Sequence, residues 1–234
     1  VRWGVEQSDA PYEGSDMLKF APDGSVFFCV HADSTIRRWD VQAQQGSVCI
    51  RLPVAGETGL DALTLGMCVS ADGRHILTWH EDQSLRVWDI ASGSLTRTTQ
   101  APTKIETATI SPDGSRVAAI ADGLCIWKGD DPKPVFVDRY FLANCLTFDP
   151  TGTHVAGSGL SDELVAVNLS DGSSRTFDGH VRADWIEWSP DGRRIAVANY
   201  DAAVAFAADT GAQTAVVGFV GNAATGGHSL TASP

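Results

Sequence analysis

Six histidines are the side chains of this sequence that could bind a metal ion or titrate near neutral pH. Their spacing matches no metal-ligand motif. His31 and His80 nevertheless occupy equivalent positions, each two residues before an aspartate. The two rings could approach each other on one face of the fold and form a shared metal or pH-sensing site. The plainer interpretation is that both are polar loop residues near a sheet edge.

Sequence motifs for catalysis are missing from these 234 residues. There is no G-x-x-x-x-G-K-[ST] loop for phosphates, no G-x-S-x-G nucleophile elbow, no H-E-x-x-H pair and no EF-hand loop. Carboxylates are numerous, but most stand in turns, where bonding to the local backbone explains them. We therefore expect no enzymatic activity, no cofactor and no bound metal.

The charge balance limits the partners. Seventeen Lys and Arg against 29 Asp and Glu give a net charge of −12, which disfavours nucleic acids and anionic membranes. No stretch approaches the roughly 18 apolar residues of a membrane helix. The odd number of cysteines and the lack of a C-x-x-C pair favour small buried side chains in a reducing compartment. We expect a cytoplasmic location; the cysteines are Cys29, Cys49, Cys68, Cys125 and Cys145.

A turn motif recurs along the chain with a period of about forty residues. Its glycines are 49, 41, 38 and 40 residues apart, in Ala21–Gly24, Ser70–Gly73, Ser111–Gly114, Asp149–Gly152 and Ser189–Gly192. A second marker ends 14 to 16 residues after each glycine, as Trp39-Asp40, Trp88-Asp89, Trp127-Lys128, Val167-Asn168 and Phe206-Ala207. Two markers that share one period indicate a repeat protein.

Each repeat has the pattern of four short strands. Proline, aspartate and glycine in the turn motif reverse the chain into a hairpin. No window has a helical period, so the sequence predicts an all-β fold. A unit of this length fits a four-stranded blade of a β-propeller better than a sandwich. The second strands are predicted at Val26–His31, His75–Trp79, Arg116–Ile120, His154–Ser158 and Arg194–Ala198.

These markers resemble the WD-repeat β-propeller family over about residues 14 to 220, most clearly in the segment His80–Asp89. The family's Gly-His dipeptide has counterparts in Gly179-His180 and Gly227-His228. In the family such a histidine joins a hydrogen-bond network with the turn aspartate, a Ser or Thr of the second strand and the tryptophan. No blade here holds the full set, so we expect the blades to depend mainly on apolar packing.

The ends of the chain suggest a propeller that continues. Residues 1–13 resemble the end of a preceding blade, because Trp3 lies 36 residues before Trp39, and residues 14–221 hold five complete blades. Residues 222–234 are interpreted as a flexible tail or the start of a further blade. We expect part of a ring of six or seven blades; the alternative is a short or divergent ring.

The family resemblance also implies an interaction face, where the turns between second and third strands lie beside the connections between blades. Carboxylates on this face would steer a basic partner; the alternative is that they serve only solubility. If the face binds a partner, reversing the charges of Glu81 and Asp82 should weaken binding with little change in the melting temperature. The connection Leu52 to Leu63 is either a specificity loop or a tolerated insertion. The predicted face comprises His31, Asp33, His80, Glu81, Asp82, Asp122, Tyr140, Phe141, Asp162, His180, Arg182, Tyr200 and Asp201.

We therefore expect a non-catalytic scaffold or sensor that binds a protein or peptide. Four lysines against thirteen arginines, with abundant Ala and Gly, are typical of a bacterial protein with a GC-rich genome, in which such a propeller is one part of a larger multidomain chain. The alternative is an accessory or gating domain of a hydrolase or peptidase.

Overall fold

The computed structural model describes residues 18–31, 34–52, 63–138, 143–159, 163–180, 183–199 and 202–218. Every regular element in these ranges is a β-strand. The twenty strands form five four-stranded antiparallel sheets, and in each sheet the strands are paired in chain order. The predicted all-β fold with five four-stranded blades is therefore confirmed. No helix in these ranges is long and apolar enough to cross a membrane.

We name the sheets blades 1 to 5. Blade 1 holds β1 (Leu18–Phe20), β2 (Val26–Val30), β3 (Thr35–Asp40) and β4 (Gln45–Arg51). Blade 2 holds β5 (Thr64–Val69), β6 (His75–His80), β7 (Ser84–Asp89) and β8 (Leu95–Gln100). Blade 3 holds β9 (Thr107–Ile110), β10 (Arg116–Ile120), β11 (Leu124–Lys128) and β12 (Val135–Asp138). Blade 4 holds β13 (Ala143–Phe148), β14 (His154–Gly159), β15 (Glu163–Asn168) and β16 (Ser174–His180). Blade 5 holds β17 (Trp185–Trp188), β18 (Arg194–Ala198), β19 (Ala202–Ala207) and β20 (Gln213–Gly218).

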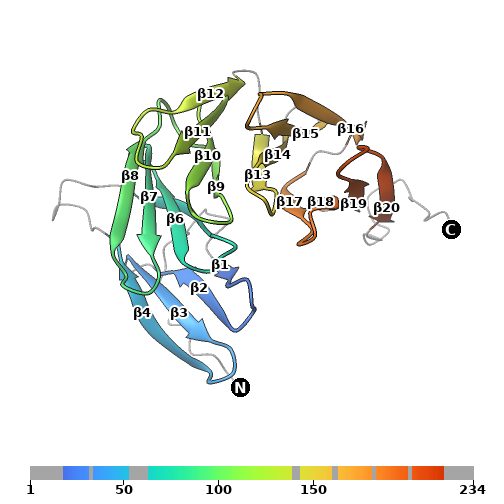
Figure 1. Ribbon diagram of the computed structural model, residues 1–234. Coiled ribbons are helices and arrows are strands. Elements are labelled where there is room, and N and C mark those ends of the chain that lie inside the picture. Colours follow the sequence, from blue (N-terminus) through green and yellow to red (C-terminus); the bar gives the residue numbers. More distant parts are fainter. Residues whose placement is uncertain are drawn as a thin grey trace, which may run out of the picture.

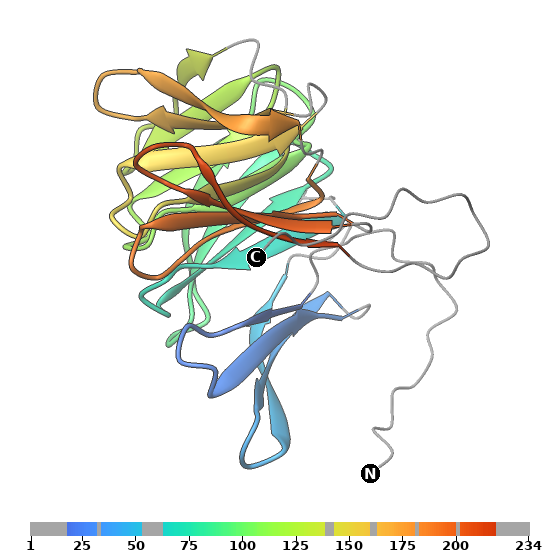
Figure 2. The same ribbon diagram turned by 90° about the vertical axis from the view of Figure 1, so that its right-hand side faces the viewer.

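The blades stand side by side around an axis. The first strand of each blade is innermost, and β1, β5, β9, β13 and β17 contact one another in that order (Figure 1). Figure 2 shows the same arc from the side of blade 5, with blade 1 below it. In the part of the chain described here the ring stays open between blades 5 and 1. The prediction of six or seven blades stays a prediction.

The turn motif has the local chemistry that its sequence predicts. The five motif glycines have φ between +69° and +74°, a region that favours glycine. In blade 3, Asp113 accepts hydrogen bonds from the Ser111 hydroxyl at 2.6 Å and from the Ser115 amide at 3.0 Å. The Ser111 hydroxyl is the main reason why the pKa of Asp113 is lowered to about 2. The motif therefore specifies each first hairpin without tertiary help.

Hydrogen bonds from the backbone and from two arginine side chains connect neighbouring blades at the end that carries these turns. The Asp72 amide donates to the Pro112 carbonyl of the next blade at 2.9 Å. Arg97 on β8 reaches the Gly129 carbonyl of blade 3 at 2.5 Å, and Arg116 on β10 reaches the Gly152 carbonyl of blade 4 at 2.8 Å. These bonds fix how adjacent blades are placed.

Apolar side chains fill the four junctions between blades. We call the side of a blade that packs on the preceding blade its front face, and the opposite side its back face. The back face of blade 1 meets the front face of blade 2 through Val26, Phe28, Ile36 and Ile50 against Met67, Ile76 and Trp88. Blades 2 and 3 meet through Leu77 and Leu85 against Val117 and Trp127. Blades 3 and 4 meet through Ala118 and Leu124 against Val155 and Val167. Blades 4 and 5 meet through Ala156, Leu164, Ile195 and Phe206. The fold rests on these junctions because one blade alone exposes both faces.

Blade 2 also contains a buried hydrogen-bond network on its front face. The Trp88 indole Nε1 donates to the Thr78 hydroxyl at 3.0 Å, and the His80 ring lies 2.8 Å from the same hydroxyl. His80 comes from the end of β6, not from a Gly-His dipeptide ahead of the blade. The network is partial, as expected, but its histidine is not the one that the family pattern would supply.

Blade 3 keeps the tryptophan of this network without its partner. By register, Ala119 stands where blade 2 has Thr78, because Val117 pairs with Trp127 as Ile76 pairs with Trp88. Trp127 is fully buried, and its Nε1 finds no hydrogen-bond partner among the described residues. An unpaired buried donor costs about 1–3 kcal/mol.

Replacing Ala119 with serine should therefore stabilise the protein, because the new hydroxyl can accept from the Trp127 indole. We expect a gain of about 0.5–1.5 kcal/mol in the free energy of unfolding, measured by urea denaturation. Ala118→Ser is the matched control, because Ala118 is equally buried on the opposite face of β10. That hydroxyl should cost about 1–3 kcal/mol. Equal losses in both variants would contradict the inference.

Candidate interaction surface

The turns between second and third strands place two carboxylates in matching positions on adjacent blades. Glu81 follows β6 and Asp122 follows β10, each eight residues after the glycine of its blade's turn motif, and both side chains are exposed. Asp122 has φ +59°, a conformation that aspartate tolerates better than most residues. These two members of the predicted face are where the sequence places them.

The connection between blades 2 and 3 contributes an ion pair beside them. Lys104 Nζ lies 3.5 Å from Glu106 Oε1, and both side chains are largely exposed. Because Glu106 offsets the charge of Lys104, the surface keeps the negative charge of Glu81 and Asp122. We name Glu81, Lys104, Glu106 and Asp122 the acidic turn surface. The sequence analysis missed the Lys104–Glu106 pair, although the position of this connection at the start of β9 could have indicated it.

Asp82 requires a correction, which concerns the expectation that its charge can be reversed with little change in stability. Its Oδ1 accepts from the Ser84 amide at 2.9 Å and from the Ser84 hydroxyl at 2.5 Å, and its Oδ2 lies 2.8 Å from Arg86 Nη2. The Arg86 side chain is 0% exposed. Burial alone would raise the pKa of Asp82, but the Ser84 hydrogen bonds and the Arg86 charge outweigh it and lower the pKa. Asp82 thus neutralises a buried cation, and its charge cannot be reversed without a cost in stability.

His80 is a second correction. Its side chain is 1% exposed, with Nδ1 3.2 Å from the Thr64 hydroxyl and Nε2 2.8 Å from the Thr78 hydroxyl. It therefore presents nothing to a partner. His31 is half-buried, and its Nε2 lies 3.0 Å from the Cys29 Sγ. In the described ranges no three His, Cys, Asp or Glu side chains gather where they could hold a metal ion.

The other predicted members lie outside the described residues. The long connection is described only at its ends, Leu52 and Leu63, and not over residues 53–62. His180 ends β16, and its side chain is outside the description. The remaining predicted positions that are not described are Asp33, Tyr140, Phe141, Asp162, Arg182, Tyr200 and Asp201.

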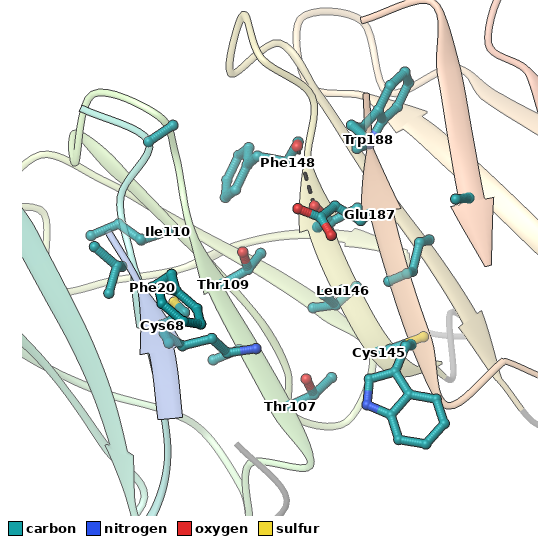
Figure 3. A pocket seen from close by; sticks show the side chains of 18 of the residues that line it. Phe20, Cys68, Thr107, Thr109, Ile110, Cys145, Leu146, Phe148, Glu187 and Trp188 are labelled. Carbon is teal, nitrogen blue, oxygen red and sulfur yellow. Dashed lines mark hydrogen bonds between the residues drawn. The ribbon is translucent and has the colours of Figure 1, made fainter. Parts of the chain in front are cut away.

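A cavity of about 1290 Å³ lies along the axis, where a propeller has its central channel. The innermost strands of all five blades line it, and Figure 3 shows Thr109, Leu146 and Glu187 among the side chains that line it. Its lining mixes aromatic and aliphatic side chains with threonines. Because these residues lie about forty positions apart in the chain, no local motif could have marked them.

The thiols do not have the environment of reactive cysteines. Burial raises the pKa of Cys29, and it raises that of Cys49 to about 11. Cys125 and Cys145 are buried, and none of the five cysteines forms a disulfide bond. Because the thiolate is the nucleophilic form, these shifts disfavour covalent chemistry at Cys29 and Cys49.

The comparisons with known proteins do not identify a family for this chain. No family model matches the sequence, and no curated protein matches it significantly. The function is therefore inferred from the geometry of the described surface.

Proposed function

We propose that this protein is a non-catalytic interaction platform of the WD-repeat type, which binds a basic protein or peptide segment on the acidic turn surface. The observation that carries the proposal is the repetition of an exposed carboxylate, Glu81 and Asp122, at the same place on two adjacent blades. An extended chain crossing the two blades would meet the same charge twice, which favours a partner with spaced Lys or Arg residues.

The scaffold beneath supports this role. The Glu81 turn is held by the Asp82 contacts with Ser84 and Arg86, and both blades are fixed by their apolar junction. A loop held on a rigid frame loses little conformational freedom when it binds, so more of the contact energy appears as affinity. We further propose that the platform belongs to a larger multidomain bacterial protein in the cytoplasm, where its partner connects it to an effector.

The proposal is tested by reversing the two charges together. We expect the double variant Glu81→Lys/Asp122→Lys to bind a fluorescent Lys-rich peptide about tenfold more weakly than the wild type, measured by anisotropy at low salt. The wild-type affinity should fall as salt is added, because exposed charges are screened. The melting temperature should fall only modestly: lysine is less favourable than aspartate at the positive φ of residue 122, but neither carboxylate pairs with a buried charge among the described residues.

Asp209→Lys is the matched control, because Asp209 is exposed in the turn between β19 and β20, at the opposite end of the blades. It should leave the affinity for the peptide nearly unchanged. Equal loss in the control would mean that net charge, and not this surface, attracts the peptide. Undiminished binding by the double variant would remove the acidic turn surface from consideration.

A further inference from the structure

The front face follows one residue pattern in all blades. Leu18 on the first strand of blade 1 occupies the same register position as Met67, Ala108 and Leu146 on the first strands of the next three blades. In each blade this residue pairs with the residue at the same position of the second strand. The position of Phe20 corresponds in the same way to Val69, Ile110, Phe148 and Trp188. Met67, Ala108, Leu146, Ile110 and Phe148 are at most 9% exposed, and Val69 and Trp188 are partly buried, since each packs on the preceding blade.

Blade 1 carries the same pattern without a cover among the described residues. Leu18 is 52% exposed and Phe20 is 57% exposed. The Phe20 ring lies 5.7 Å from Phe27, which in turn stacks on Trp39 at 6.2 Å between ring centroids. Trp39 is half-buried, whereas Trp88 in the same place on blade 2 is 4% exposed. The front face of blade 1 is therefore half of a blade junction that lacks its other half.

The back face of blade 5 is the complementary half. Ala196 is exposed, although Ala118 and Ala156 in the same register position are fully buried. Val217 is 58% exposed, whereas its counterpart in blade 1, Ile50, is 1% exposed. Of the nine large apolar side chains exposed in the described ranges, five lie on these two faces: Leu18, Phe20, Val48, Trp185 and Val217.

We propose that the chain associates head to tail, with the front face of blade 1 of one copy packing on the back face of blade 5 of a second copy. The chain already makes this type of junction four times within itself, and it carries one unused example of each half. The front face supplies large aromatic side chains, and the back face supplies small alanines beside the exposed Trp185 and Val217. A second copy therefore offers the matching surface that each open face lacks.

The contact is heterologous, because two different surfaces meet. It can continue to further copies unless the geometry closes a ring, so the assembly should grow with concentration. The net charge of −12 opposes it, because like-charged copies repel. Added salt should thus strengthen this association while it weakens binding of a basic peptide to the acidic turn surface, which separates this inference from the proposed function.

The test is the mass of the full chain by light scattering after gel filtration, over about a hundredfold range of concentration. We expect the mass to rise above that of a monomer in the wild type. Phe20→Glu on the front face and Val217→Glu on the back face should each return it to the monomer. Val135→Glu is the matched control, because Val135 is 66% exposed on β12 of blade 3, outside both faces, and this variant should associate like the wild type.

Mixing the two single variants gives the decisive result. Phe20→Glu keeps an intact back face and Val217→Glu keeps an intact front face, so the mixture should form dimers of fixed size that do not grow. All these side chains are largely exposed, so the variants should fold, as checked by their melting temperatures. A wild type that is monomeric throughout, or a mixture that forms no dimer, would overturn the proposal. Residues 1–17 or 219–234, or a different partner, would then be the cover of these faces.

Discussion

Replacing Trp88 with alanine should lower the free energy of unfolding by about 3–5 kcal/mol, one of the two largest effects that we expect. The side chain is 4% exposed, packs in the junction of blades 1 and 2, and donates a hydrogen bond to Thr78. Its removal leaves a cavity between two blades and an indole-sized loss of apolar contact. The measurement is urea unfolding of the variant beside the wild type.

Two further substitutions separate packing from hydrogen bonding. Trp88→Phe keeps most of the apolar volume and removes only the indole donor, so we expect it to lose a smaller part of the stability. Trp185→Ala is the control for the loss of a tryptophan. Because Trp185 is 47% exposed, this substitution should lower the free energy of unfolding much less. A loss below about 1 kcal/mol in Trp88→Ala would contradict the core assignment of Trp88.

The second large effect concerns the ion pair of Asp82 and Arg86. Arg86 is fully buried and Asp82 is 28% exposed, so removing the Asp82 carboxylate leaves a buried and unpaired cation, which costs up to about 3–5 kcal/mol. We therefore expect Asp82→Ala to destabilise the protein by this order. Arg86 Nε and Nη1 already lack a hydrogen-bond partner among the described residues, so Asp82 provides the compensating charge that the structure describes.

The double variant distinguishes a buried charge from a lost turn contact. Arg86→Met removes the cation, so Asp82→Ala should cost far less in that background. In Asp82→Asn the side-chain oxygen can still accept hydrogen bonds from Ser84, but the negative charge is gone. The loss of stability in this variant therefore measures the charge pairing with Arg86. An equal loss from Asp82→Ala in both backgrounds would show that the Ser84 contacts alone explain the effect.

The free energy of unfolding at acidic pH provides an independent test of the Asp82–Arg86 ion pair. The pKa of Asp82 is lowered in the folded protein, from an ordinary value of 3.8. Its contribution to stability is therefore complete above about pH 4 and is lost as the pH falls through the folded pKa. The difference in stability between wild type and Asp82→Asn should shrink over that range.

The sequence alone determined the fold class, the number of complete blades and the limits of the second strand of each blade. The turn motif acts within four residues through proline, aspartate and a glycine with positive φ, so its effect can be read locally. The predicted second strands at His75–Trp79, Arg116–Ile120 and Arg194–Ala198 differ from β6, β10 and β18 by at most one residue. The exposed Glu81 and Asp122 also follow from these turns.

Only the tertiary structure decided what is buried at the junctions. His80 at the end of β6 and Asp82 in the turn after it form a segment that looks polar and exposed in the sequence, yet His80 is 1% exposed and Asp82 pairs with the buried Arg86. The axial cavity and the two unmatched faces likewise depend on residues about one or several repeats apart. A repeat pattern specifies each blade, but burial is a property of two blades in contact, and this is why local sequence could not reveal it.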